Sequence, residues 1–440
     1  MRLLPVLVLL LASAPVHADD EAAPSSILIR NVRVFDGEAD DVGPGRHVLV
    51  TGNVIERVSA DPIDAGDAQV IDGGGRVLIP GLIDAHVHVT VNMPISALKN
   101  ADTMYVGARA ARELRRMLMR GFTTVRDAAG PTFGLKRAVD EGLIDGPRIY
   151  PSGAAISQTS GHGDFRGWAD RHRRWGGHPD RSEEMGAVTI ADGVPEVLAA
   201  VREQLRLGAS QIKLMAGGGV VSRHDPLDVS QYTTDELKAA VDAASDWGTY
   251  VTVHAYNSRS VRRAVNAGVA CIEHGHLVDE HTMKLLADRG VFLSPQVVTF
   301  EVGLPGLDAH QMHRLEQARA GTDRMLRLAA KHGVTIVFGT DLLGDPKLQA
   351  LQPKEFAARA RWFKPVEILR QATSNAAKLM ALTGPRNPYP KRLGVIAEGA
   401  YADMLIVRSN PLEDIRVLAD PETNLMLIMK DGKVYRNELE

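Results

Sequence analysis

The sequence predicts an α/β protein: a (β/α)8 TIM barrel with a small β-sandwich domain built from both chain ends. Between residues 82 and 383, eight strand-like segments alternate with helical patterns, which is typical of a parallel barrel. Both chain ends instead contain short strand-like runs that Gly, Asp and Pro separate. A doubly wound open sheet is the alternative, and it is disfavoured because no G-x-G-x-x-G motif follows an early strand.

The bulk composition is that of an ordinary globular protein. The chain has 440 residues, 45% of them hydrophobic and 24% charged, which is enough apolar material for a large core. The formal net charge of −3 does not favour binding to nucleic acid or to an anionic membrane. The single Cys271 cannot form an intramolecular disulfide, and its apolar neighbours indicate a small core residue.

Residues 1–18 have the pattern of a secretory signal peptide. A basic start at Arg2 precedes an apolar run over residues 3–12, and Ala18 ends a small-residue cleavage site. We expect cleavage after Ala18 and export to a bacterial periplasm or to the medium. The apolar run is too short for a comfortable membrane span, and we expect no span in the mature chain.

The rest of the chain divides into three segments. Residues 19–80 and 386–440 carry the strand-like runs of the two β fragments, and residues 81–385 carry the barrel pattern. Because domain termini often lie close together, the two end fragments can pair into one sandwich. The expected barrel strands cover residues 82–88, 122–127, 148–156, 211–216, 250–254, 271–274, 291–295 and 335–341, and the expected helices cover residues 102–120, 195–207, 234–247, 258–267, 280–289, 318–332 and 365–383.

Two of the expected strand-to-helix connections are long. Residues 157–193 follow the third strand, and residues 217–233 follow the fourth. Long loops without secondary structure inside a compact domain are usually functional lids or disordered segments. Both connections start at the carboxyl ends of barrel strands, where such barrels place their active sites. We therefore expect these loops to form the walls of a substrate pocket.

The first barrel strand ends in two histidines, His86 and His88. Side chains at positions i and i+2 of a strand point to the same side, so both imidazoles can reach one metal ion. Other strands end in Lys213, His254, His274 and Asp341. Nitrogen and oxygen donors of this kind suit Zn²⁺, with Mn²⁺, Co²⁺ and Fe²⁺ as alternatives.

Lys213 is unusual because it lies within an apolar strand, where a cation is costly to bury. One interpretation is a structural lysine that extends to a neighbouring carboxylate. The other is reaction of its amine with CO2, which gives a carbamate, an anionic oxygen donor able to bridge two metal ions. Residue chemistry alone leaves both interpretations open.

Together these residues resemble those of the metal-dependent amidohydrolase superfamily, over essentially the whole mature length. The resemblance depends on Lys213, His254 and four motifs: Pro80-Gly-Leu-Ile-Asp-Ala-His-Val-His88, Gly121-Phe-Thr-Thr-Val-Arg-Asp127, Glu273-His-Gly-His276 and Gly339-Thr-Asp341. Within the superfamily the chain is most similar to secreted or periplasmic prolidase-like dipeptidases of the Xaa-Pro and Xaa-Arg/Lys carboxypeptidase type, and to related ochratoxin A-hydrolysing amidohydrolases. Residues 156–164 and 213–222 carry that closer similarity.

The resemblance implies a site with two divalent metal ions, for which Zn²⁺ is favoured. His86, His88 and Asp341 would hold the first ion, and His254 and His274 the second. Lys213, as N6-carboxylysine, and a hydroxide would bridge them. The implied reaction is cleavage of the amide next to the C-terminal amino acid of a dipeptide or N-acyl amino acid, with ochratoxin A among the candidate substrates. Similar enzymes often form large homo-oligomers, octamers among them.

Four further polar residues are candidates for contact with a small-molecule substrate. With Asp341 as the proton carrier, His162 and Tyr232 are the other candidate catalytic residues, and both are also candidates for substrate binding. Arg223 and His224 are candidates for binding a terminal carboxylate. The alternatives are a solvated loop histidine for His162 and an aromatic side chain packed at a helix start for Tyr232.

Two other functions remain open. The first is a deaminase or cyclic-amide hydrolase on the same scaffold; related deaminases typically show His-x-x-Glu near the fifth strand, where this chain has His254-Ala-Tyr-Asn257. The second is a metal-binding protein without catalysis. Substrate preference depends on the pocket lining: an inward Asp225 or Asp228 would favour Lys or Arg, whereas inward Trp or Leu side chains would favour Pro, Phe or an aromatic amide.

Overall fold

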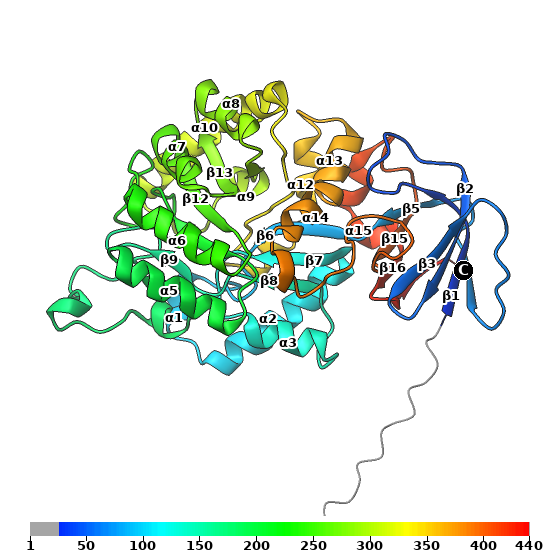
Figure 1. Ribbon diagram of the computed structural model, residues 1–440, viewed down its shortest axis with the longest axis horizontal. Helices are drawn as coiled ribbons and strands as arrows, with labels where there is room; N and C mark the ends of the chain where they lie inside the picture. Colours follow the sequence, from blue (N-terminus) through cyan, green and yellow to red (C-terminus); the bar gives the residue numbers. More distant parts are fainter. Residues whose placement is uncertain (1–25, 440) are drawn as a thin grey trace, which may run out of the picture.

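The computed structural model describes residues 26–439 of the chain. The expected signal peptide, residues 1–18, lies outside the described residues. The first and last strands of the described residues share a small β domain at one end of the molecule (Figure 1). The larger part contains parallel strands with helices packed around them. Within the described residues, no helix is long and apolar enough to span a membrane.

The β domain joins both chain ends in one mixed sheet, so the expected sandwich is a single continuous sheet. Its spatial order is β17-β16-β15-β5-β1-β2-β3, with β4 paired to β1. A shared apolar core includes Ile29, Leu78 and Ile406, one from each of three separate segments. The strands are β1 (Ser26–Val34), β2 (Gly45–Thr51), β3 (Val54–Ser59), β4 (Gln69–Asp72), β5 (Val77–Pro80), β15 (Met404–Val407), β16 (Leu425–Lys430) and β17 (Lys433–Asn437).

The barrel strands form two parallel sheets, and every pair within them is parallel. The smaller sheet has the order β6-β7-β8, and the larger has the order β10-β9-β11-β12-β13-β14. The strands are β6 (Leu82–Val87), β7 (Phe122–Asp127), β8 (Arg148–Pro151), β9 (Ala155–Ser157), β10 (Val188–Ile190), β11 (Ile212–Met215), β12 (Val251–Asn257), β13 (Cys271–Leu277) and β14 (Phe292–Ser294).

The third and eighth expected strands differ from the prediction. Residues 152–154 interrupt the third, so that β8 pairs with β7 while β9 pairs with β11; Gly153 has a φ of 69° there, a value that favours glycine. Residues 335–341 form only an isolated bridge to β14. Their backbone nevertheless bonds to β14 through Val337 N–H and Leu293 O (3.0 Å), and to β6 through Asp341 N–H and His86 O (2.8 Å). This segment therefore lies between β14 and β6, in the order of a (β/α)8 barrel.

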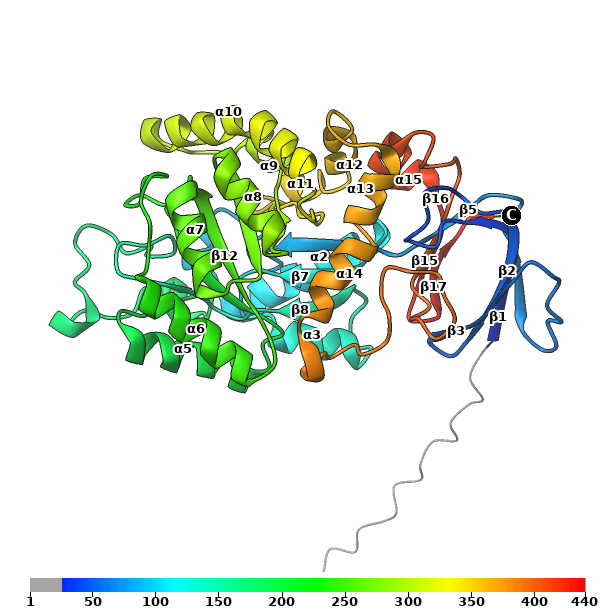
Figure 2. The ribbon, with the colours of Figure 1, turned by 45° about the horizontal axis from the view of Figure 1, so that its top comes forward.

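Helices cover the outside of the barrel strands (Figure 2). The longer ones are α2 (Thr103–Met119), α3 (Phe133–Asp140), α5 (Val194–Leu207), α6 (Thr234–Asp246), α7 (Ser258–Ala267), α8 (Glu280–Asp288), α10 (Ala309–His332), α13 (Pro365–Gln371) and α14 (Ser374–Ala381). The shorter ones are α1 (Ile95–Lys99), α4 (Arg181–Glu184), α9 (Val298–Val302), α11 (Pro346–Gln349), α12 (Lys354–Arg359) and α15 (Pro421–Asn424).

Two helical predictions need correction. The helix expected over residues 318–332 begins at Ala309, because Asp308 and Gln311 form a capping box at its start. The helix expected over residues 365–383 is divided at Thr373, whose φ and ψ of −133° and −101° are not helical. Helix α3 was not expected from the sequence. The long connection 157–193 contains α4, β10 and one 3-10 turn, whereas 217–233 is irregular apart from a bridge between Gly217 and Ser230.

Candidate metal centre and active site

A cavity of about 150 Å³ opens at the carboxyl ends of the barrel strands. The six side chains expected to bind metal all line it: His86, His88, Lys213, His254, His274 and Asp341. We call these six residues the floor of the cavity. Five of them come from β6, β11, β12, β13 and the segment between β14 and β6, and His88 directly follows β6. The parallel strand order therefore brings all six to one end of the barrel.

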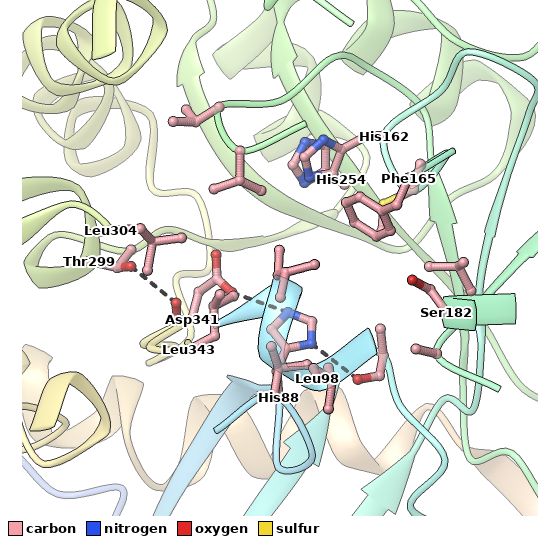
Figure 3. Close-up of a pocket in the computed structure, with 18 of the residues that line it drawn as sticks. His88, Leu98, His162, Phe165, Ser182, His254, Thr299, Leu304, Asp341 and Leu343 are labelled. Carbon is pink, nitrogen blue, oxygen red and sulfur yellow. Dashed lines mark hydrogen bonds and ion pairs between the residues drawn. The ribbon is translucent and has the colours of Figure 1, made fainter. Parts of the chain in front are cut away.

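His86, His88 and Asp341 form the tightest group on the floor. One ligand atom from each lies within 4.8 Å of the other two. The Oδ1 atom of Asp341 is 3.1 Å from His88 Nε2 (Figure 3). The same atom is 3.5 Å from His86 Nε2. The same Oδ1 atom is buried without a well-formed hydrogen bond. A cation among two imidazole nitrogens and this carboxylate would supply the missing partner, so the donor set fits Zn²⁺.

Buried partners fix the orientation of the first two histidines. His86 Nδ1–H donates to Glu273 Oε2 at 2.8 Å, and the other carboxylate oxygen of Glu273 accepts from Arg126 at 2.5 Å. Both Glu273 and Arg126 are fully buried. His88 Nδ1–H donates to the carbonyl of Ala129 at 3.2 Å. Each imidazole is thus held on its Nδ1 side, which leaves Nε2 for the cavity, as in metal-binding histidines generally.

His254 and His274 form the second group on the floor, and their ring centroids are 4.4 Å apart. His254 Nε2–H donates to the carbonyl of Gly218 at 3.1 Å, and His274 Nδ1–H donates to Gln296 Oε1 at 2.7 Å. A carbonyl oxygen can only accept, so the opposite ring nitrogen keeps its lone pair in each histidine. His254 therefore offers Nδ1 and His274 offers Nε2 to a cation.

Burial lowers the pKa of His86 to about 4 and the pKa values of His254 and His274 well below the ordinary value. These imidazoles are neutral at pH 7, the form that binds metal. Burial also opposes the charged form of His88, but its hydrogen bond to Asp341 raises the pKa of that imidazole. Burial also lowers the pKa of the Lys213 amine, which favours the neutral form that can react with CO2. Burial opposes ionisation of Asp341, but the imidazoles of His86 and His88 hold the pKa of its carboxyl below its usual range.

Backbone strain marks two floor residues. His274 has a φ of 76° and Asp341 has a φ of 49°, both in the left-handed region that non-glycine residues rarely adopt. Such conformations cost about 1–3 kcal/mol each and persist where the surrounding structure imposes them, most often at functional sites. Two such residues at one cavity indicate that the orientation of these ligands is maintained at the expense of stability.

His162 lies beside the floor and lines the same cavity. Its ring stacks on His254 with centroids 4.0 Å apart and planes inclined by 13° (Figure 3). Its Nδ1 atom is 2.8 Å from Ser222 Oγ and 3.1 Å from Asp225 Oδ2. The predicted loop histidine is therefore buried and oriented by the second long loop, rather than solvated.

The structure does not bring the other three expected substrate-binding residues to the cavity. The ring of Tyr232 is buried in the hydrophobic core and does not line the cavity. Its hydroxyl donates to the carbonyl of Ala191 at 3.0 Å. Arg223 and His224 instead line a second depression beside α10, and His224 Nε2–H donates to the carbonyl of Arg166. Loop 217–233 turns these side chains outward, so their expected contact with substrate is not supported.

The rest of the cavity lining is mostly apolar, and the sequence carried no signal for it. We call this lining, together with His162, the wall of the cavity. Figure 3 shows Leu98, Phe165, Leu304 and Leu343 around the polar groups. Such residues come from separate loops without a common periodicity, so no sequence pattern marks them. The apolar wall residues include Val91, Ile95, Leu98, Phe165, Met185, Val188, Val220, Val221, Phe300, Leu304, Leu307, Leu315 and Leu343.

The polar part of the wall contains one ammonium group. Lys99 lines the cavity and donates to the carbonyl of Phe165 and to Asp180, at 2.7 Å each. Lys99 thereby ties the segment after β6 to the long loop after β9. The exposed Trp168 and Trp175 of that loop are not part of the cavity lining.

Several known proteins are similar to this chain in sequence and fold. Residues 77–435 match the family model described as "Amidohydrolase family". Ochratoxinase from Aspergillus niger is 34% identical over 382 residues, which cover 82% of this chain and 76% of that protein. A crystal structure of a prolidase complexed with N-methylphosphonate-L-proline is 38% identical, with a TM-score of 0.87 and coverage of 94% of this chain and 100% of that one. A Xaa-Pro dipeptidase crystallised with methionine in its active site is 30% identical, with a TM-score of 0.81 and the same coverage.

Proposed function

The chain belongs to the amidohydrolase family and is a hydrolase of amide or peptide bonds, and on that premise we propose that it works with two divalent metal ions, preferably Zn²⁺. We propose that it cleaves the amide next to the C-terminal amino acid of a dipeptide or N-acyl amino acid. One observation carries this proposal: four histidines, one aspartate and one buried lysine line a single cavity at the strand ends.

Each residue has a defined task in this proposal. His86, His88 and Asp341 would hold one ion, His254 and His274 the other, and Lys213 would bridge them as N6-carboxylysine. When bound, the two ions supply a hydroxide at neutral pH and polarise the scissile carbonyl. Asp341 would take the proton of the attacking group and pass it to the leaving amine. His162 lies next to His254 and would orient the substrate or its developing oxyanion.

The wall supports a preference for apolar substrates. Asp225 is engaged with His162 and Ser222, and Asp228 lies at the second depression, so neither offers a carboxylate for a substrate Lys or Arg. Apolar side chains on the wall favour Pro, Phe, Met or an aromatic acyl group, and ochratoxin A fits that description. The names of the related prolidase and ochratoxinase agree with this class.

A nitrogen donor is needed for the terminal carboxylate of such substrates. Arg223 and His224 face another depression, which leaves Lys99 and His162 as the nitrogen-bearing wall residues in the described chain. We propose that Lys99 binds the carboxylate, because its ammonium group lies at the cavity and carries three donors. A Lys99→Met substitution should raise KM more than it lowers kcat, since it removes binding rather than chemistry.

Deamination is the alternative that the structure disfavours most. Asn257, at the position where related deaminases have glutamate, donates its side-chain amide to the carbonyls of Leu227 and Val229. Its oxygen caps α7 by accepting from Ser260 N–H. Asn257 is therefore used structurally and cannot transfer a proton. Cyclic-amide hydrolysis on the same floor remains the second candidate.

The proposal is tested with zinc-loaded protein and a panel of dipeptides, N-acyl amino acids, ochratoxin A and cyclic amides. We expect hydrolysis of open-chain amides with an apolar C-terminal residue, and about two zinc ions per chain. The Lys213→Ala variant should lose most activity and bind less zinc. Full activity of Lys213→Ala would exclude the bridged two-metal site, and cleavage of cyclic amides alone would favour the second candidate.

Export and assembly are further proposals. We propose that the chain is exported and cleaved near Ala18, and that the mature enzyme is a homo-oligomer, with an octamer as one form. Expression of the full chain in a Gram-negative host, followed by N-terminal sequencing of the periplasmic product, tests the cleavage. Light scattering of the purified mature protein tests the assembly, and a mass equal to one chain would contradict the oligomer.

A further inference from the structure

The starting observation is the enclosure of the His162 ring. One face of the ring stacks on His254, a floor residue. On another side it lies against the backbone of Gly219, where an added Cβ atom would be 2.0 Å from both ring atoms Nδ1 and Cε1. Glycine at this position therefore permits the close approach of the loop to the ring. The ring is held between a barrel strand and the loop after β11.

The Nδ1 side of His162 is committed to the same loop. Ser222 Oγ lies 2.8 Å from Nδ1, and Asp225 Oδ2 lies 3.1 Å from it. The Ser222 hydroxyl itself donates to the other oxygen of Asp225. A carboxylate oxygen accepts hydrogen bonds, so His162 Nδ1 carries a hydrogen and donates it to Asp225 Oδ2. The described residues make no hydrogen bond to Nε2, which is left for the cavity.

Asp225 is itself held from several directions. It is 1% exposed, and the side-chain amide of Gln231 lies 3.4 Å from its Oδ2 atom. Gln231 also accepts the backbone N–H of His162 at 2.9 Å. The carboxylate of Asp225 thus belongs to a closed network that includes both the backbone and the side chain of His162.

Arg314 of α10 anchors the loop that carries this network. Its guanidinium donates to the carbonyls of Gly219 (2.9 Å), Ser222 (2.6 Å) and Asp225 (3.0 Å). Arg314 is buried, and a guanidinium fork bonded to three carbonyls restrains the loop backbone at three points. Helix α10 is therefore the rigid support for the position of Asp225.

We propose that Asp225, supported by Ser222 and Arg314, is a positioning residue that fixes the tautomer and the orientation of His162 towards the substrate. This role rests on the proposed function in one respect: the group that His162 Nε2 contacts is taken to be an amide substrate. Asp225 acts through His162 and does not touch the substrate. A carboxylate that accepts from one ring nitrogen of a histidine fixes which nitrogen carries the hydrogen and which way the ring points.

The test compares two aspartates of one loop in zinc-loaded protein. Asp225→Asn should lower kcat/KM by about 10- to 100-fold, the loss typical of an orienting partner, with unchanged zinc content. The matched control Asp228→Asn removes the same charge from an exposed position three residues later and should leave kcat/KM unchanged. Combining Asp225→Asn with His162→Ala should cost no more than His162→Ala alone, because the aspartate acts through the histidine.

Crystal structures supply a second measurement that needs no turnover. In Asp225→Ala we expect the His162 ring to rotate away from its stack on His254, while the metal ligands stay in place. If Asp225→Ala does not fold, Ser222→Ala perturbs the same hydrogen-bond network and should give the same rotation. A chain that hydrolyses no amide would overturn the proposed function, and the ring orientation would still test the role of Asp225.

The proposal is overturned by either of two results. The first is an Asp225→Asn variant with the kcat/KM of Asp228→Asn. The second is a His162 ring that keeps its orientation in the Asp225 and Ser222 variants. Additive losses in the double variant would also count against it, because they would mean that Asp225 acts independently of His162.

Discussion

The floor and the wall of the cavity are built in different ways. Floor side chains stand at the ends of barrel strands, and four of them are imidazoles with a buried partner on one ring nitrogen. The wall depends on loops whose position is set by contacts far along the chain, such as Arg314 with Ser222. The metal-binding side chains are therefore placed by strand order, whereas the lining that meets the substrate is placed by loop packing.

The largest expected effect is on the floor, at Asp341. The Asp341→Asn variant keeps the shape of the side chain but removes the charge that faces His86 and His88. Because the residue is proposed both to bind metal and to carry a proton, we expect a loss of kcat/KM of about 10³-fold or more. Activity and zinc content measure the effect. Asp345→Asn, at the start of α11, is the matched control and should retain both.

The next effect is expected behind the floor, at Glu273. The Glu273→Gln variant leaves the buried Arg126 without its counter-charge, and breaking such a pair typically costs about 3–5 kcal/mol of unfolding free energy. It also removes the charged acceptor of His86, so zinc affinity should fall by about 10- to 100-fold. Chemical denaturation and zinc titration measure the two losses. Glu203→Gln, which breaks an exposed pair with Arg206, should change neither, and equal behaviour of the two variants would contradict the comparison.

A smaller effect concerns pH and His276, which is buried on β13 two residues after His274. Burial lowers the pKa of His276 from 6.5 to about 4, so the folded protein binds fewer protons than the unfolded chain between these pH values. The stability that the neutral His276 contributes to the metal-free protein should therefore be full above pH 6.5 and be lost as the pH drops towards 4. His276 contributes up to about 3 kcal/mol to that loss.

Denaturation of the metal-free protein at pH 7 and pH 4.5 measures this slope. Asp84 and Asp127, whose burial raises their pKa values to about 6, act in the opposite direction and reduce the net change. The comparison with His276→Gln isolates one histidine, since the two acids are unchanged. A slope as steep in the variant as in the wild type would contradict the prediction.

The smallest effects are expected for the loop residues that face away from the cavity. Tyr232→Phe loses the hydrogen bond to Ala191, so we expect about 1 kcal/mol less stability and a kcat/KM within about threefold of wild type. Arg223→Gln should be close to neutral, because its side chain lines the second depression. Steady-state kinetics and thermal unfolding measure both variants. A tenfold loss of kcat/KM in either variant would contradict this prediction and would mean that the substituted residue contributes to the active site.

The fold could be predicted well where local patterns repeat. Alternating strands and helices indicated the barrel, and the strand ends indicated which side chains share one side of it. The prediction was poorer where the chain departs from a regular period, at residues 152–154, at Thr373 and in residues 335–341. The ends and breaks of the elements there depend on helix capping and irregular backbone geometry, and hydrophobic periodicity predicts neither.

Sequence patterns alone predicted the order of the barrel strands and the set of six floor side chains. Both follow from regular features of strands. Side chains two residues apart on a strand point to the same side, and parallel strands in a barrel have their carboxyl ends on one side of it. No sequence pattern predicted that Tyr232 bonds to Ala191, that Arg223 and His224 line a second depression, or that Asp225 faces His162. A loop without a hydrophobic period takes its direction from distant partners, here above all from the Arg314 guanidinium on α10.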